Sequence, residues 1–104
     1  MVTALAAQGT TLDAAPAERF GRAPFFVLVR DGSVTEVLSN EEAEGASGVG
    51  GRVVMRLAEK GVRRVVAPQF GPKAQEALNA AGMEALTLCA PTLRDLLALL
   101  EARG

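Results

Sequence analysis

The chain contains no histidine and only one cysteine, Cys89, among its 104 residues. Without histidine, no imidazole is available for general acid–base catalysis near neutral pH. A single cysteine cannot form an intramolecular disulfide, and a free thiol fits a reducing compartment. The sequence therefore predicts a cytoplasmic protein and gives no support for catalysis by a histidine.

An excess of charge of one sign and long apolar runs are also missing. The 11 basic and 12 acidic residues give a formal net charge of −1, which creates no field that attracts nucleic acid or an anionic membrane. No apolar run approaches the roughly 20 residues that a membrane-spanning helix needs, and Met1–Ala7 lacks the basic start of a signal peptide. With 49% apolar and 22% charged residues, the composition predicts one folded domain over residues 1–104, with neither nucleic acid nor a membrane as partner.

The first half of the chain predicts three strands. Val2–Ala7 is mostly apolar, and Phe25–Val29 has the unbroken apolar pattern of a strand that is buried on both faces. Residues 8–19 between them have no periodic apolar pattern and are expected to form a loop. Asp31-Gly32 is the preferred pair for a tight hairpin, because both central residues need positive φ, and Ser33–Leu38 then returns as an edge strand.

The second half alternates helices with strands. After a loop over 39–51, the expected elements are a helix that ends at Gly61, a strand over Val62–Ala67, a helix from Pro72 to the stop at Gly82, and a strand over Met83–Cys89. A last helix begins at Thr92, with Asp95 in a capping box. Its buried stripe consists of Leu93, Leu96, Leu97 and Leu100. Strands that alternate with helices pair in parallel through right-handed crossovers. The predicted fold is therefore α/β, with a mixed sheet of five strands and three helices in the order βββαβαβα.

A glycine-rich segment, Gly45–Arg52, superficially resembles a phosphate-binding P-loop. However, Gly51 stands where lysine would reach the phosphates, and Arg52 stands where a hydroxyl would bind magnesium. Two interpretations remain open for the segment. It is either a flexible entry to the helix or a nest of backbone amides that attracts an anion at the helix N-terminus.

Two loops carry candidate binding residues. Arg19 and Arg22 bracket Phe20-Gly21 before the buried strand, and two guanidinium groups can clamp an anion through bidentate hydrogen bonds. The alternative is a solvated loop on which they pair with Asp13 or Glu18.

The second loop, Gln69–Lys73, follows a parallel strand at the edge where open α/β sheets bind ligands, although an ordinary strand-to-helix connection is the alternative. In that loop Gly71 permits close backbone approach and Lys73 adds positive charge.

Cys89 carries the only soft metal ligand besides the weaker methionine thioethers. The alternative is that it is a small, buried apolar residue. Iron–sulfur clusters normally take several cysteine thiolates, so one cysteine cannot hold a conventional cluster in one subunit. A cluster that binds through Cys89 would therefore already be coordinated by inorganic sulfide and accessory ligands, or it would bridge two subunits.

The segment from Glu18 to Phe26, E-R-F-G-R-A-P-F-F, resembles the E-H-F-G-R-A-P-x-F signature of the dinitrogenase iron–molybdenum cofactor biosynthesis family. Arg19 stands where that family often has histidine. Further positions agree in order and spacing, so that the resemblance covers nearly the whole chain; they are Phe70-Gly71-Pro72-Lys73-Ala74, Gly82-Met83 and Thr92. The resemblance implies a ribonuclease-H-like fold.

The function that the resemblance implies is transient binding or delivery of an iron–sulfur or iron–molybdenum cluster precursor, with no tightly bound cofactor. The partners would be a metal cluster or small anion and a protein of cofactor assembly. The candidate binding residues are Arg19, Phe20, Gly21, Arg22, Gly71, Lys73 and Cys89, with Cys89 as the metal ligand. The alternative is a regulatory or protein-interaction module that keeps the fold and has lost cluster binding. No enzymatic activity is expected, because the first strand lacks the carboxylates with which ribonuclease-H-like nucleases bind two metal ions.

Overall fold

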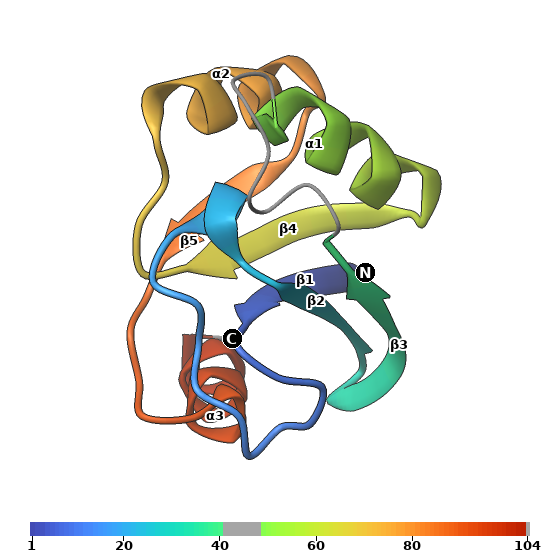
Figure 1. Cartoon of the computed structure of the whole chain (residues 1–104). Coiled ribbons are helices and arrows are strands. Elements are labelled where there is room, and N and C mark those ends of the chain that lie inside the picture. Colours follow the sequence, from blue (N-terminus) through green and yellow to red (C-terminus); the bar gives the residue numbers. More distant parts are fainter. Residues whose placement is uncertain (41–48, 104) are drawn as a thin grey trace.

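The computed structural model describes residues 1–40 and 49–103 (Figure 1). Within these residues, five strands and three α-helices follow one another in the expected order βββαβαβα. The elements are β1 (Val2–Ala7), the short 3-10 helix η1 (Phe20–Arg22), β2 (Phe25–Arg30), β3 (Ser33–Ser39), α1 (Val49–Glu59), β4 (Val62–Ala67), α2 (Pro72–Ala80), β5 (Glu84–Thr87) and α3 (Leu93–Arg103). The predicted α/β fold is confirmed.

The sheet has the strand order β3-β2-β1-β4-β5. β2 pairs antiparallel with both β1 and β3, whereas β4 pairs parallel with β1 and β5. The predicted interior strand is confirmed, since residues 26–29 of β2 are buried, and β3 is an edge strand whose first four residues are exposed. Positive φ values of 53° at Asp31 and 79° at Gly32 confirm the tight hairpin between them.

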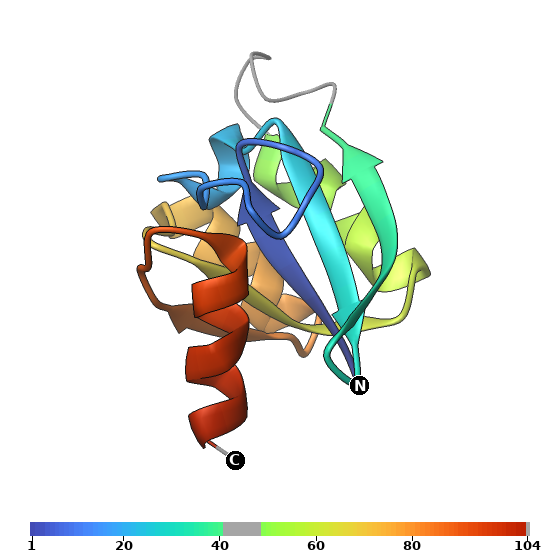
Figure 2. The same ribbon diagram turned by 90° about the horizontal axis from the view of Figure 1, so that it is seen from below.

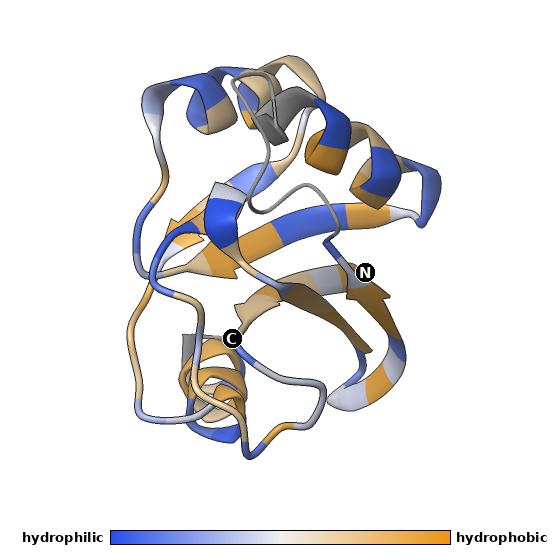
Figure 3. Cartoon of the chain, in the orientation of Figure 1, coloured by the Kyte–Doolittle hydropathy of each residue, from blue (hydrophilic) through white to orange (hydrophobic). Residues whose placement is uncertain are grey.

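Helices cover both faces of the sheet. α1 and α2 lie on one face and α3 lies on the other (Figures 1 and 2). Because side chains alternate along a strand, β1 contributes Ala4 and Ala6 to the core under α1 and α2, and it contributes Leu5 and Ala7 to the core under α3. The predicted stripe of α3 is buried in that second core, and it consists of Leu93, Leu96, Leu97 and Leu100. Figure 3 shows β2 as an almost continuous apolar strand between the two layers.

The predicted strand over Met83–Cys89 is wrong at both ends, because β5 covers only Glu84–Thr87. At its start, Gly82 adopts a φ of 74° and the Met83 N–H donates to the Leu78 carbonyl at 2.9 Å, so Met83 belongs to the end of α2. At its end, β4 stops at Ala67, and the partner strand that would pair with Cys89 is missing. Cys89 therefore lies on a loop.

The predicted loop over 39–51 is too long at both ends. β3 includes Ser39, and α1 begins at Val49, so the backbone of residues 49–51 is helical although two of them are glycines. Glycine disfavours a helix by about 1 kcal/mol per residue relative to alanine, and tertiary packing overrides it here. Val53 and Leu57 of α1 are buried against the sheet. Residues 45–48 of the P-loop-like segment lie outside the described residues.

No helix in the described parts of the chain is long and apolar enough to cross a membrane. This finding agrees with the absence of long apolar runs from the sequence.

Candidate functional site

The loops with the predicted binding residues meet at one edge of the sheet. β1, β4 and β5 run parallel to one another, so their carboxyl ends at Ala7, Ala67 and Thr87 point the same way (Figure 1). Open α/β sheets bind ligands in the crevice outside this edge. The chain places residues 8–22 after β1, 68–71 after β4 and 88–92 after β5 there.

Two of these loops, residues 18–22 and 68–73, are held together and are called the loop pair below. Arg19 and Gln69 form an isolated parallel bridge, and the Phe20 N–H donates to the Gln69 carbonyl at 3.0 Å. The Phe20 ring lies 5.2 Å from the ring of Phe26 and 5.4 Å from that of Phe70, centroid to centroid. Backbone hydrogen bonds and packed rings therefore join two segments that are 50 residues apart in the sequence.

Phe20, a predicted binding residue, is fully buried, with 0% of its surface exposed. Its side chain therefore packs in the core and does not face a ligand. Phe20 contributes to the site by anchoring η1, which begins at Phe20 and ends at Arg22. The anchored loop then presents Arg19 and Arg22 on the surface.

Three predicted basic residues lie on the loop pair, and the side chains of Arg19, Arg22 and Lys73 are all exposed. Asp13, which the sequence offered as a partner for Arg19 or Arg22, instead accepts from the Arg94 guanidinium at 3.2 Å. Among the described residues, Arg19 and Lys73 form no side-chain ion pair. Their charge is therefore available to an anion from solution.

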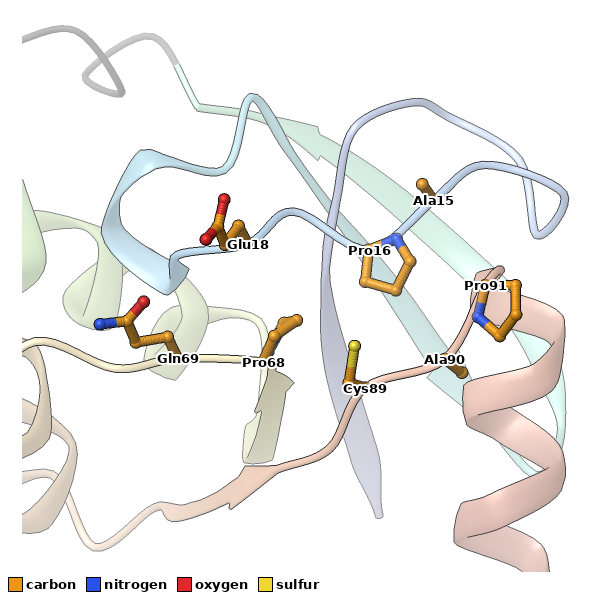
Figure 4. Close-up of a pocket in the computed structure, with 8 residues that line it drawn as sticks. All are labelled: Ala15, Pro16, Glu18, Pro68, Gln69, Cys89, Ala90 and Pro91. Carbon is orange, nitrogen blue, oxygen red and sulfur yellow. The ribbon is translucent and has the colours of Figure 1, made fainter.

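Cys89 is exposed, so the interpretation as a small buried residue is wrong. It lines a pocket of about 430 Å³, called the thiol pocket below (Figure 4). The wall of this pocket consists of Ala15, Pro16, Glu18, Pro68, Gln69, Cys89, Ala90 and Pro91. In Figure 4 the sulfur points up into the space between Pro16 and Pro68. The thiol is exposed because β5 ends two residues earlier and leaves Cys89 on a proline-flanked loop.

The thiol pocket adjoins the loop pair. Glu18, Pro68 and Gln69 of the loop pair line one side of the pocket, and Arg19 and Phe70 directly follow Glu18 and Gln69 in the sequence. The site thus has two parts, an apolar pocket with one thiol and one carboxylate, and a basic surface beside it. Sequence reasoning missed Glu18 and the prolines as pocket residues, and the only signal for them was their position next to the predicted loops.

The amino end of α3 also lies at this edge, and the preceding loop closes it. The Leu93 N–H donates to the Ala14 carbonyl and the Arg94 N–H donates to the Leu12 carbonyl, both at 2.9 Å. The predicted cap by Thr92 is confirmed as well, but the Asp95 carboxylate contacts the Thr92 hydroxyl and not the backbone N–H that would complete a capping box. The Asp95 N–H donates to Thr92 Oγ1 at 3.2 Å, and the Thr92 hydroxyl donates to the Asp95 carboxylate at 3.0 Å. These bonds satisfy amides that would otherwise attract an anion.

Within residues 1–40 and 49–103, no side chain caps the amino end of α2. Its N-cap residue is Gly71, which has no side chain that could accept from the first-turn amides, and Pro72 follows at the first helical position. The positive end of the helix dipole therefore faces the same edge as Lys73, in the loop pair. Open amides and an exposed ammonium group together favour an anion at this point.

The donor set excludes a metal centre built from protein ligands alone in the described part of the chain. No group of three or more His, Cys, Asp or Glu side chains within residues 1–40 and 49–103 could hold a metal ion. Cys89 is one soft ligand beside positive charge. Such a site fits an anion that brings most of its own ligands, and it does not fit a bare metal ion.

A model of the dinitrogenase iron-molybdenum cofactor family matches residues 1–103. Among solved structures, the chain is similar to the apo form of the orange protein from Desulfovibrio gigas, with 32% identity and a TM-score of 0.87 over 98% of this chain and 88% of that one. It is also similar to a putative NifB protein from Thermotoga that is assigned to the DUF35 family, with 31% identity and a TM-score of 0.85 over 97% of this chain and 87% of that one. No curated protein matches the chain at a comparable level of significance. The chain belongs to the dinitrogenase iron-molybdenum cofactor family.

Proposed function

We propose that this domain binds an iron–sulfur or iron–molybdenum cluster precursor transiently and delivers it to a protein of cofactor assembly. Membership of the family supports a role in handling such a cofactor. The observation that carries the proposal is the exposed thiol of Cys89, which lies in a pocket beside the basic loop pair. The cluster is the cargo of the protein and not a resident cofactor.

The chemistry of the two parts of the site is complementary. A thiolate is a soft ligand that iron in a sulfide cluster accepts readily. Arginine supplies directed hydrogen-bond donors and positive charge, and it does not compete for the metal. One thiolate ligand and the positive charge of the arginines together hold an anionic cluster. Because the protein supplies only one bond to the metal, only that bond must break when the cluster is delivered. The arrangement therefore fits a carrier better than a site of permanent attachment.

The proposal is tested with a synthetic [4Fe–4S] cluster that carries small thiolate ligands. The Cys89 thiol would replace one of these thiolate ligands and transfer its proton to it, so that the displaced ligand leaves as a free thiol. After anaerobic incubation and gel filtration, visible absorption should elute with the wild-type protein. Cys89→Ser should abolish this absorption and Arg22→Ala should weaken it. Arg30→Ala is the matched control, because Arg30 pairs with Val2 at the opposite end of the sheet.

Two outcomes would contradict the proposal. If the wild type elutes without visible absorption, the carrier function is wrong, and the protein-interaction module becomes the better description of this domain. If Cys89→Ser retains as much cluster as the wild type, the thiol is not the ligand. In that second case, the thiolate-anchored carrier is wrong even though the domain binds the cluster.

We also propose that the domain is not an enzyme. It has no histidine, and its first strand carries no carboxylate that could bind a catalytic metal ion. The purified domain should leave RNA–DNA hybrids intact in the presence of magnesium or manganese. Cleavage that co-purifies with the domain and disappears in Asp13→Ala would overturn this expectation.

A further inference from the structure

A small pocket lies at the end of the sheet opposite the loop pair, between the β2–β3 hairpin and the last turns of α3. Figure 2 shows the hairpin and the carboxyl end of α3 at the end of the sheet where β1 begins. The pocket has a volume of about 140 Å³, which is room for several water molecules and therefore for a small ligand. It is called the hairpin pocket below, and its wall includes Thr3, Asp31, Arg64, Leu97, Leu100 and Glu101.

The hairpin pocket contains a buried hydroxyl group. Thr3 is the one polar residue of β1, and its side chain lies on the face of the sheet that α3 covers, together with those of Leu5 and Ala7. Thr3 is only 7% exposed and lines the pocket. In the described part of the chain, its hydroxyl forms no hydrogen bond. A buried hydroxyl without a partner destabilises the fold, and valine would fill the same space without this cost, so Thr3 points to a ligand in the pocket.

Two carboxylates line the same pocket. They belong to Asp31 and Glu101, and a Cβ atom added at Gly32 would lie 3.1 Å from Glu101 Oε1. The carboxylate of Glu101 therefore lies against the turn that Asp31 begins. Within residues 1–40 and 49–103, neither carboxylate forms an ion pair. Because like charges repel each other, this side of the pocket favours a positively charged group.

A guanidinium group lies on the other side of Thr3. Thr3 pairs with Val29 of β2, the strand that leads into the hairpin, and with Arg64 of β4. Arg64 Nε donates to the Glu84 carboxylate at 3.0 Å, and among the described residues its two terminal nitrogens form no hydrogen bond. The terminal nitrogens of a guanidinium group bind a carboxylate through parallel hydrogen bonds. The pocket therefore presents groups for both a positive and a negative charge.

We propose that the hairpin pocket binds a small α-amino acid as its zwitterion. The ammonium group has three N–H donors, and the pocket offers three acceptors for them, which are the carboxylates of Asp31 and Glu101 and the Thr3 hydroxyl. The carboxylate of the amino acid accepts from Arg64. The leucines of α3 make part of the wall apolar, and the small volume favours a short side chain. A bare metal ion fits less well, because the guanidinium group repels it.

This site goes beyond the proposed function. The hairpin pocket and the thiol pocket share no lining residue, and they lie at opposite ends of the sheet. Binding of an amino acid and binding of a cluster are therefore measured independently.

The test follows the amide resonances of the isotope-labelled full chain by NMR while glycine, L-alanine or L-serine is added. At least one of these amino acids should shift the resonances of Thr3 and Gly32. The matching amine and carboxylic acid, such as ethylamine and propionate for alanine, should each bind about tenfold more weakly or less, because each lacks one charged group and its hydrogen bonds. Thr3→Val should weaken binding by about tenfold and keep or raise the unfolding temperature, since it removes an unpaired buried hydroxyl.

Thr87→Val is the matched control, because Thr87 is exposed at the carboxyl end of β5, away from the hairpin pocket, and it should bind as the wild type does. If none of the three amino acids shifts the resonances, or if Thr3→Val binds as tightly as the wild type, the inference is wrong. Equal binding of the amine and the amino acid would show a cation site and would also overturn it. A lower unfolding temperature of Thr3→Val would show that the fold itself uses the hydroxyl, and the inference would lose its basis. All of these failures leave the proposed function intact.

Discussion

The amino ends of α2 and α3 lie at the same edge of the sheet and are built in opposite ways. The end of α3 is closed by two backbone carbonyls and by the Thr92 hydroxyl, which accept from its first three amides. The end of α2 begins at Gly71 and Pro72 and has no side-chain cap. The fold thus completes the hydrogen bonds of one helix and leaves the other exposed between an anchored loop and a lysine.

This difference separates a helix start whose amides the fold satisfies from one that has no side-chain cap. Among the described helices, α3 alone lies on its face of the sheet, so an unsatisfied amino end would weaken the cover of the core beneath it. α2 shares its face with α1, and its start is held from outside by the packed rings of Phe20 and Phe70. Helices that keep open amides are the ones on which proteins bind anions. The comparison therefore favours the amino end of α2 over that of α3 as a place for an anion.

The largest expected loss of stability follows a change of Phe20, whose ring holds the loop beside the uncapped amino end of α2. Phe20→Ala should lower the free energy of unfolding by about 3–5 kcal/mol, because the fully buried ring leaves a cavity between Phe26 and Phe70. Urea unfolding measures this loss. Phe20→Leu keeps most of the volume and should lose clearly less. Equal, small losses in both variants would show that the open side does not depend on its anchor.

The next effect concerns the closed side. Thr92→Ala removes the acceptor of the Asp95 N–H and should lower the free energy of unfolding by about 1 kcal/mol, as is typical of a lost N-cap. Thr92→Ser keeps the hydroxyl and should retain most of the stability in the same urea measurement. A Thr92→Ala variant as stable as the wild type would mean that the loop carbonyls alone close α3.

A smaller effect of opposite sign is expected when the open side is closed. Gly71→Ser provides a cap for α2 and should raise the free energy of unfolding by a few tenths of a kcal/mol. Gly71→Ala adds a side chain without an acceptor and should not gain this increment. If the serine variant is less stable than the alanine variant, the start of α2 is not open in the sense described.

The smallest effect is expected at the exposed ion pair between Asp13 and Arg94, whose side chains are 79% and 62% exposed. Asp13→Ala should change the free energy of unfolding by at most about 0.5 kcal/mol, since such surface pairs contribute little. The loop is held to α3 mainly by its backbone carbonyls. A large loss that disappears at high salt would show that charge, and not the backbone, closes this side.

The sequence by itself determined most of the fold, because the signals involved are local. The unbroken apolar run of β2, the Asp31-Gly32 pair and the leucine stripe of α3 each fix one element through its own periodicity or turn chemistry. The order of the elements then determined the parallel pairing. The ends of the elements were less predictable. β5 ends where its partner strand β4 ends, and the first turn of α1 contains two glycines that are helical because of tertiary packing.

The candidate site was determined only in part. The sequence pointed to Arg19, Arg22, Gly71 and Lys73 by motif and by place after a strand, and the structure puts them around one loop pair. It did not determine that Phe20 is an anchor, because burial depends on Phe26 and Phe70 from other parts of the chain. The exposure of Cys89 and the closure of α3 by residues 12–14 were likewise decided by the tertiary structure. Contacts between residues dozens of positions apart leave no periodic trace in the sequence, so only the folded chain assigns one helix end to stability and leaves the other open.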